Sequence, residues 1–123
     1  MKKHSPRFLT LVTQVKKQIN EITPQALKAL IDGQQPFHLI DVRENDELSS
    51  GHIPTAMHLS KGIIERDIEK QIPDPQTPVV LYCSGGFRCA LVANSLQNMG
   101  YTHVSSLNTG LQGWIDAGYP VEK

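Results

Sequence analysis

Short apolar runs alternate along this chain with segments in which hydrophobic residues recur at helical spacing. The apolar runs are brief and bounded by turn residues, as is typical of buried strands; they cover residues 37–42, 56–59, 79–82 and 102–107. Helical spacing predicts helices over 24–32, 61–71 and 89–99 and a terminal helix between Thr109 and Gly118, while the charged segment 43–48 predicts a short solvated helix. Strands that alternate with helices indicate an α/β domain with a mostly parallel sheet.

Individual residues mark several ends of these elements. Thr23 is suited to the N-cap of the predicted helix over 24–32, with Pro24 at the first position of that helix. Gly100 suits the left-handed position just past the end of the helix over 89–99. The apolar face of that helix is formed by Cys89, Val92, Ala93, Leu96 and Met99. Trp114 is expected in the core, where it fastens the terminal helix.

Residues 1–19 form a separate pattern that is basic and amphipathic. The segment holds no acidic residue, and its basic and apolar side chains are Lys2, Lys3, Arg7, Lys16 and Lys17, and Phe8, Leu11, Val12, Val15 and Ile19. We expect an amphipathic helix that packs on the domain formed by residues 20–123, or on a second subunit of a homodimer. Association with a membrane surface and a mitochondrial transit peptide are alternatives, whereas a signal peptide is disfavoured because no small-residue cleavage site follows.

Composition narrows the classes of function. A chain of 123 residues is long enough for one domain with a real core. Its 12 basic and 12 acidic residues give no net charge, which argues against nucleic acid as a partner, and no apolar run is long enough for stable membrane insertion. Two cysteines are too few for a disulfide scaffold and the five histidines lack metal-ligand spacing, so we expect no metal and no cofactor. Thiol chemistry in a reducing, cytoplasmic compartment fits this composition.

The stretch from Val79 to Cys89 carries the candidate chemistry. An apolar strand runs into Cys83, a loop with two glycines and the start of a helix. Glycine lets backbone N–H groups turn toward one point, and a helix N-terminus adds partial positive charge, so the loop predicts an anion site. A cysteine there is expected to have a lowered pKa and to react as the thiolate, and Arg88 adds a cation that binds oxyanions bidentately. The alternative is an ordinary turn with a buried cysteine.

Four segments of the chain, in the same order, resemble the sequence motifs of rhodanese domains. They comprise two fingerprints, an active-site loop and a closing segment: LIDVRE at 39–44, GHIPTA at 51–56, the loop at 81–88, and GLQGW with AGYPV at 110–121. The resemblance extends over residues 20–122. It implies a single rhodanese-like domain with a mostly parallel central sheet flanked by helices on both faces.

The resemblance also implies a chemistry, namely sulfur transfer. In this family a cysteine becomes a persulfide and passes its outer, sulfane sulfur to a thiophilic acceptor, and by position that cysteine is Cys83. The loop residues that are implied to bind the substrate are Ser84, Gly85, Gly86, Phe87 and Arg88. Implied partners are a small donor such as thiosulfate or a thiol persulfide, or a protein of a sulfur relay. Asp41 and Arg43 end a strand near the site, where we expect them to hold neighbouring loops, with direct substrate contact as the alternative.

Three residues of the loop and helix start refine this expectation. No cation lies between Cys83 and Arg88, so Arg88 alone supplies charge, and a thiol persulfide or protein-bound persulfide is favoured over thiosulfate as donor. Phe87 is expected either to pack inward or to stand at the rim, where it would shape the docking of a partner. Cys89 is expected to be buried packing, with a resolving thiol for Cys83 as the alternative.

Two other functions share parts of this pattern. Phosphatases and arsenate reductases of rhodanese-like architecture also combine a cysteine, an anion-binding loop and an arginine. Those enzymes have one more residue in the loop, whereas four residues separate Cys83 from Arg88 here, which favours sulfur chemistry. A non-catalytic binding module of the same architecture usually lacks the cysteine, so the presence of Cys83 argues against it.

Overall fold

The computed structural model describes residues 4–123, and within that range the chain forms five strands, five α-helices and one 3-10 helix. In chain order these elements are α1 (Pro6–Lys16), β1 (Asn20–Ile22), α2 (Pro24–Asp32), β2 (His38–Asp41), η1 (Asn45–Ser50), β3 (Met57–His58), α3 (Ile64–Gln71), β4 (Val79–Tyr82), α4 (Arg88–Asn98), β5 (Val104–Leu107) and α5 (Gly110–Asp116). No helix in this range is both long and apolar enough to cross a membrane.

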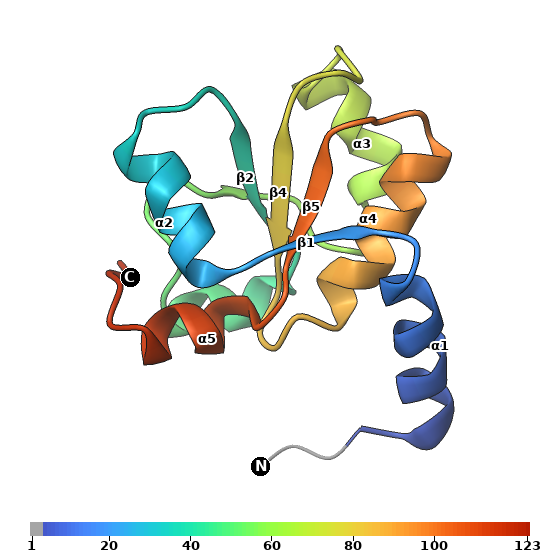
Figure 1. The fold of residues 1–123 in the computed structure, drawn as a ribbon, viewed down its shortest axis with the longest axis horizontal. Coiled ribbons are helices and arrows are strands. Elements are labelled where there is room, and N and C mark those ends of the chain that lie inside the picture. The colour runs from blue at the N-terminus through green and yellow to red at the C-terminus, as the bar shows by residue number, and fades with distance from the viewer. Residues whose placement is uncertain (1–3) are drawn as a thin grey trace.

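The strands form a single sheet in the order β1-β5-β4-β2-β3, and every pairing is parallel. The predicted parallel sheet of an α/β domain is thereby confirmed. Figure 1 shows α2 and α5 on one side of the sheet and α3 and α4 on the other, with α1 alongside α4. Strand β4 lies at the centre of the order, so the residues that follow it emerge in the middle of the carboxyl edge, where parallel sheets place their ligands.

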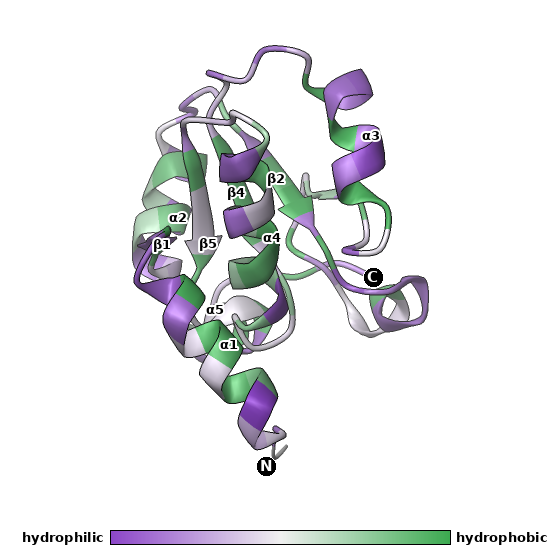
Figure 2. Cartoon of the chain, turned by 90° about the vertical axis from the view of Figure 1, so that its right-hand side faces the viewer, coloured by the Kyte–Doolittle hydropathy of each residue, from purple (hydrophilic) through white to green (hydrophobic). Residues whose placement is uncertain are grey.

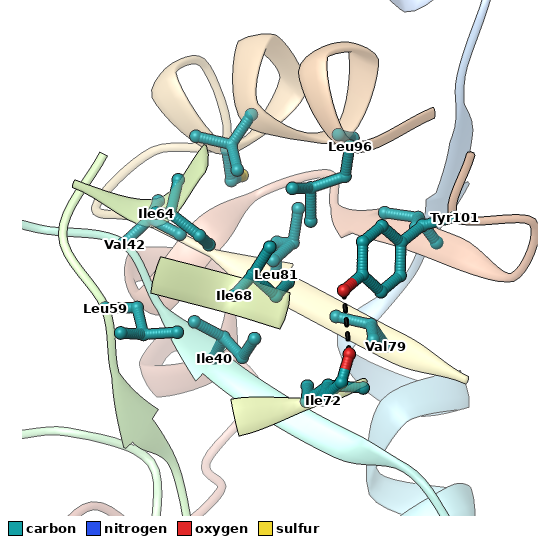
Figure 3. Packing of buried hydrophobic residues seen from close by; sticks show 14 of the residues in the cluster. Ile40, Val42, Leu59, Ile64, Ile68, Ile72, Val79, Leu81, Leu96 and Tyr101 are labelled. Carbon is teal, nitrogen blue, oxygen red and sulfur yellow. Dashed lines mark hydrogen bonds between the residues drawn. The ribbon is translucent and has the colours of Figure 1, made fainter. Parts of the chain in front are cut away.

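Alternation along the central strand divides the core into two layers. Val79 and Leu81 face α3 and α4, whereas Val80 and Tyr82 face α2 and α5. In the first layer (Figure 3) the hydroxyl of Tyr101 donates a hydrogen bond of 2.7 Å to the carbonyl of Ile72. Figure 2 shows the consequence: the middle of β2 is hydrophobic, while α1, α3 and α4 carry both hydrophobic and hydrophilic residues. The sheet is thus buried on both sides by amphipathic helices.

The second layer contains Trp114, which is 1% exposed as expected for a core residue. Its indole N–H donates to the carbonyl of Pro120 at 2.8 Å, and its ring lies 4.9 Å from that of Tyr119, centroid to centroid. The tail beyond α5 is therefore fastened back onto the helix. Thr23 also acts as predicted, since its hydroxyl accepts the Ala26 N–H at 3.1 Å.

Several element boundaries differ from the prediction. Strand β1 was not predicted, because it is only three residues long and lacks an apolar run. Helix α3 begins at Ile64 rather than at 61, and the charged segment forms a 3-10 helix displaced to Asn45–Ser50. Met99, assigned to the apolar face of α4, is 36% exposed because it caps the helix end, where Gly100 takes the predicted positive φ of 101°.

Helix α1 packs against α4 of its own chain. Val12 and Val15 are buried against Ala90, and Phe8 and Ile19 add to the same cluster. Leu11, expected on this face, is instead 49% exposed, since it lies on the outer side of the helix. Lys2 and Lys3 of the basic pattern lie outside the described residues, and the division of the chain at residue 20 stays a prediction.

The seating of α1 can be tested with two substitutions on opposite sides of the helix. Val12→Ala is expected to lower the free energy of unfolding by about 1.5–3 kcal/mol, because it removes a fully buried side chain and leaves a cavity. Leu11→Ala, on the exposed side, is expected to change it by less than about 0.5 kcal/mol. Urea denaturation measures both. Equal losses would show that α1 does not pack on α4 through Val12.

Candidate active site

Cys83 directly follows the central strand β4 at the carboxyl edge of the sheet. Its side chain is 1% exposed, and the loop that it opens runs through an exposed Ser84 and Gly85 to the start of α4. The Sγ atom of Cys83 accepts two backbone hydrogen bonds, from the N–H of Gly86 at 3.2 Å and from the N–H of Cys89 at 3.4 Å. The sulfur thus sits where the loop and the first turn of α4 converge, as the sequence predicts for an anionic thiolate.

The first turn of α5 sets the direction of the loop's peptide groups. The Leu111 N–H donates to the carbonyl of Cys83 at 2.8 Å, and the Gln112 N–H donates to the carbonyl of Ser84 at 3.0 Å. In a trans peptide the N–H points opposite to the carbonyl, so the N–H groups of Ser84 and Gly85 face away from α5. Helix α5 therefore binds the two carbonyls and leaves the N–H groups of Ser84 and Gly85 directed to the opposite side of the loop. This role of residues 110–112 was not anticipated from the sequence.

Two glycines are required where the loop meets its neighbours. Gly86 has a φ of 93°, and a Cβ there would collide with the backbone carbonyl of Asn108. Gly110 has a φ of 63°, and a Cβ there would lie 2.5 Å from the carbonyl oxygen of Ser84. Gly85 differs, since a Cβ at that position meets nothing within 4 Å. The close contact of the loop with Asn108 thus depends on Gly86 and its contact with α5 depends on Gly110, whereas Gly85 is not required.

Cys89 lies beneath Cys83 and is 0% exposed, as expected for a buried residue. The two Sγ atoms are 3.6 Å apart, and the hydroxyl of Ser106 donates to the Sγ of Cys89 at 3.0 Å. The hydrogen bond with Cys89 lowers the pKa of the Cys83 thiol, and the two backbone N–H donors and the charge of Arg88 add to this against the opposing effect of burial. The same contact, together with burial, raises the pKa of Cys89. One thiolate and one neutral thiol result.

Arg88 is paired with an acid that the sequence did not single out. Its guanidinium donates bidentately to the carboxylate of Glu47, at 2.7 and 2.9 Å, across 41 positions of sequence. This pairing lowers the pKa of Glu47 to about 2, and it raises the pKa of Arg88. The cation expected to serve the loop is thus largely neutralised in the structure, although its charge still acts on Cys83.

Asp41 and Arg43 connect this acid to the sheet. Arg43 donates to both carboxylate oxygens of Asp41, at 2.7 Å for the shortest contact, and both side chains are buried. The same guanidinium donates to the backbone carbonyls of Glu47 and Gly51, at 3.2 and 2.7 Å. The pair therefore fixes the η1 segment and, through it, the acid that holds Arg88. Hydrogen bonds of this kind to neighbouring loops are what we expect of Asp41 and Arg43 from the sequence.

Phe87 is half-buried and packs against α1, a contact that the sequence did not reveal. Its ring lies 6.2 Å from that of Phe8 and 4.5 Å from that of His4, centroid to centroid, and the Lys16 Nζ atom lies 5.3 Å from its centroid. The N-terminal helix thus touches the candidate loop directly. Elsewhere in residues 4–123, the structure brings together no group of three side chains suited to a metal ion.

Comparison with known proteins places this geometry in context. Residues 23–117 match the family model described as a rhodanese-like domain. The chain is similar to the thiosulfate sulfurtransferase GlpE of Haemophilus influenzae, with 30% identity over 102 residues that cover 83% of this chain and 93% of the relative.

Two solved structures share the fold over nearly the whole chain. The polysulfide-sulfur transferase homodimer of Wolinella succinogenes has a TM-score of 0.80 at 28% identity, covering 94% of this chain and 87% of that one. A Rhodopseudomonas palustris protein of unknown function, described as a possible tyrosine phosphatase, has a TM-score of 0.84 at 30% identity and covers 99% of both chains.

The two loop glycines provide a matched pair of substitutions. Gly86→Ala is expected to abolish most Cys83 reactivity or destabilise the domain by about 1–3 kcal/mol, because the new Cβ meets the Asn108 carbonyl and the positive φ is strained. Gly85→Ala is expected to leave stability within about 0.5 kcal/mol of the parent. Thermal unfolding and iodoacetamide labelling of Cys83 measure both effects. Equal tolerance of both substitutions would contradict the described contact between loop and Asn108.

Proposed function

Since the chain belongs to the rhodanese-like sulfurtransferase family, with a family match over residues 23–117, we propose that it is a sulfurtransferase that carries sulfane sulfur as a persulfide on Cys83. The observation that carries this proposal is the convergence of donors on the Cys83 Sγ, which accepts the N–H groups of both Gly86 and Cys89. Neutral N–H donors stabilise an anionic sulfur without adding a charge that would repel or trap the product.

The reaction divides into two displacements at sulfur. In the first, the Cys83 thiolate attacks the sulfane sulfur of the donor, a bond forms to that sulfur, and the rest of the donor leaves with the electron pair of the broken bond. In the second, an acceptor such as a thiolate or cyanide attacks the outer sulfur, and Cys83 leaves as the thiolate. The loop residues Ser84 to Arg88 are proposed to surround the outer sulfur in the intermediate state, because the N–H groups of Ser84 and Gly85 face away from α5.

The neutralised arginine favours donors of low charge. Two unit charges about 4 Å apart repel by about 1 kcal/mol in water, so a dianion such as thiosulfate meets about twice the repulsion from the Cys83 thiolate that a monoanion meets. Glu47 holds the guanidinium of Arg88 at 2.7 and 2.9 Å and so reduces the attraction that would offset this repulsion. We therefore propose a thiol persulfide, or a persulfide on a relay protein, as a better donor than thiosulfate.

Phosphatase chemistry is the competing function, and loop length separates the two. A phosphoryl group on the Cys83 sulfur carries three oxygens, each of which needs donors at about 2.7–3.1 Å. Four residues separate Cys83 from Arg88, and the single arginine is already bound to Glu47. This loop suits one sulfur atom better than a tetrahedral oxyanion.

The proposed function is tested with Cys83→Ser and the parent protein side by side. Exposure to a thiol persulfide is expected to add the mass of one sulfur atom to the parent, on the peptide that contains Cys83, and to add none to Cys83→Ser. Sulfur transfer to cyanide should be lost in the variant while its thermal unfolding is retained, because serine is close to isosteric. Release of phosphate from an aryl phosphate by the parent but not by the variant, without persulfide formation, would replace the proposal by the phosphatase function.

Donor preference is expected to respond to Glu47→Gln, which removes the charge but keeps an oxygen for the backbone N–H of Glu44. Freed from its partner, Arg88 should attract thiosulfate more than the singly charged persulfide of mercaptoethanol, and the ratio of the two loading rates should shift toward thiosulfate by about fivefold, corresponding to one extra unit charge. Glu65→Gln, on the exposed side of α3, is the control and should leave the ratio unchanged. An unchanged ratio in Glu47→Gln would contradict the assigned effect of the pair.

A further inference from the structure

Cys89 has a hydrogen-bonding environment that packing alone does not require. Its Sγ lies 3.6 Å from the Sγ of Cys83 and 3.7 Å from the backbone carbonyl oxygen of Leu107, and the hydroxyl of Ser106 donates to it at 3.0 Å. Cys89 and Ser106 are both 0% exposed. A buried hydroxyl aimed at a buried thiol next to the candidate nucleophile indicates an ordered chain of three groups.

The donor and acceptor properties of these groups fix the direction of the hydrogen bonds that link Ser106, Cys89 and Cys83. A carbonyl oxygen only accepts, so Leu107 cannot donate to the Cys89 sulfur, and the Ser106 proton is already directed at it. The Cys83 sulfur receives two N–H donors, and in the thiolate form that they favour it carries no proton, so it can only accept from Cys89. The S–H of Cys89 is left with two acceptors, the Cys83 sulfur and the Leu107 carbonyl. Burial beside an anionic sulfur keeps Cys89 protonated and able to donate.

The hydrogen bond that the Cys89 S–H group donates to the Cys83 sulfur changes in strength during the reaction. In the free thiolate the negative charge lies on the Cys83 Sγ, where the Cys89 S–H is within reach at 3.6 Å. In the persulfide the charge has moved to the outer sulfur, away from Cys89, and the same S–H can turn to Leu107. Charge returns to the Cys83 Sγ when the acceptor removes the outer sulfur, so a donor at this place stabilises the departing thiolate more than the persulfide.

We propose that Cys89 is a catalytic hydrogen-bond donor that stabilises Cys83 as the leaving group when the persulfide is discharged, and that Ser106 is the positioning residue that orients its thiol. This inference rests on the proposed function, since it assigns a role within the same reaction. In the discharge step the acceptor bonds to the outer sulfur, and the bond between that sulfur and Cys83 breaks. The electron pair stays on the Cys83 Sγ, and Cys89 keeps its proton.

The test compares Cys89→Ala, which removes the donor, with Cys89→Ser, which restores an O–H at the same place. Cys83 is first loaded with one sulfur by a thiol persulfide, and loss of that mass on addition of cyanide is then followed in a single turnover. Cys89→Ala is expected to slow discharge by about three- to tenfold, the range for one neutral hydrogen bond, whereas Cys89→Ser stays within about twofold of the parent. Ser106→Ala is expected to slow discharge less than Cys89→Ala does. Ser105→Ala is the control and should not slow it, because Ser105 lies on the opposite face of β5 from Ser106.

A second measurement separates loss of the hydrogen-bond donor from loss of side-chain volume at Cys89, and it does not require a sulfur atom to be loaded on Cys83. The pH profile of iodoacetamide labelling at Cys83, located by peptide mass, should shift to a higher apparent pKa in Cys89→Ala and be restored by Cys89→Ser. Arg88 on α4, whose charge acts on this sulfur, and its partner Glu47 in η1 are unchanged in all variants. If no donor loads Cys83, the proposed function fails, while this profile still decides whether Cys89 donates to Cys83.

Three results would overturn the inference. The first is an unchanged labelling profile in a folded Cys89→Ala variant. The second is equal slowing of discharge by the alanine and serine variants, which would indicate that side-chain volume matters and not the donor. The third is accumulation of a Cys83–Cys89 disulfide with release of hydrosulfide when loaded protein stands without acceptor, because Cys89 would then be the attacking nucleophile. If Cys89→Ala does not fold, an unchanged labelling profile together with an unchanged discharge rate in a folded Ser106→Ala variant would overturn the inference.

Discussion

Two hydrogen bonds from the start of α5 to the carbonyls of Cys83 and Ser84 set the chemistry of the loop. Without them, the peptides after Cys83 would be free to turn either their carbonyl or their N–H groups toward the sulfur. With them, the carbonyls are bound on one side and the N–H groups lie on the other. The close approach that they need requires Gly110, where a side chain would meet the Ser84 carbonyl, and the same loop requires Gly86, where a side chain would meet the Asn108 carbonyl.

Charge around the loop is balanced rather than concentrated. The buried pair of Asp41 and Arg43 holds the η1 segment, which carries Glu47, and Glu47 in turn holds Arg88. Stabilisation of the sulfur therefore comes mainly from short-range donors, namely two backbone N–H groups and the neighbouring thiol. Such donors act on charge as it forms on one atom, whereas a free cation would attract any anion. The arrangement suits the proposed exchange between thiolate and persulfide.

The parts of the fold that were predictable depend on local pattern. Apolar runs located β2, β4 and β5, helical spacing located α2 and α4, and the motifs around Cys83 identified the family, which the match over 23–117 confirms. What was missed depends on contacts between distant segments. Strand β1 exists because it pairs with β5, Glu47 meets Arg88 only in the fold, and Phe87 finds its partners on α1. No local periodicity records such pairings, which are set by tertiary packing.

The loop's N–H groups are proposed to hold the anionic sulfur of Cys83, and an amide proton–nitrogen correlation spectrum tests this claim most directly. Spectra of the isotope-labelled protein are recorded before and after one sulfur atom is added, with the addition verified by mass. The largest shifts are expected at the amides of Gly86 and Cys89, whose N–H groups contact the sulfur, and of Ser84 and Gly85, whose N–H groups face away from α5. Addition of the sulfur while these amides keep their positions would contradict the claim.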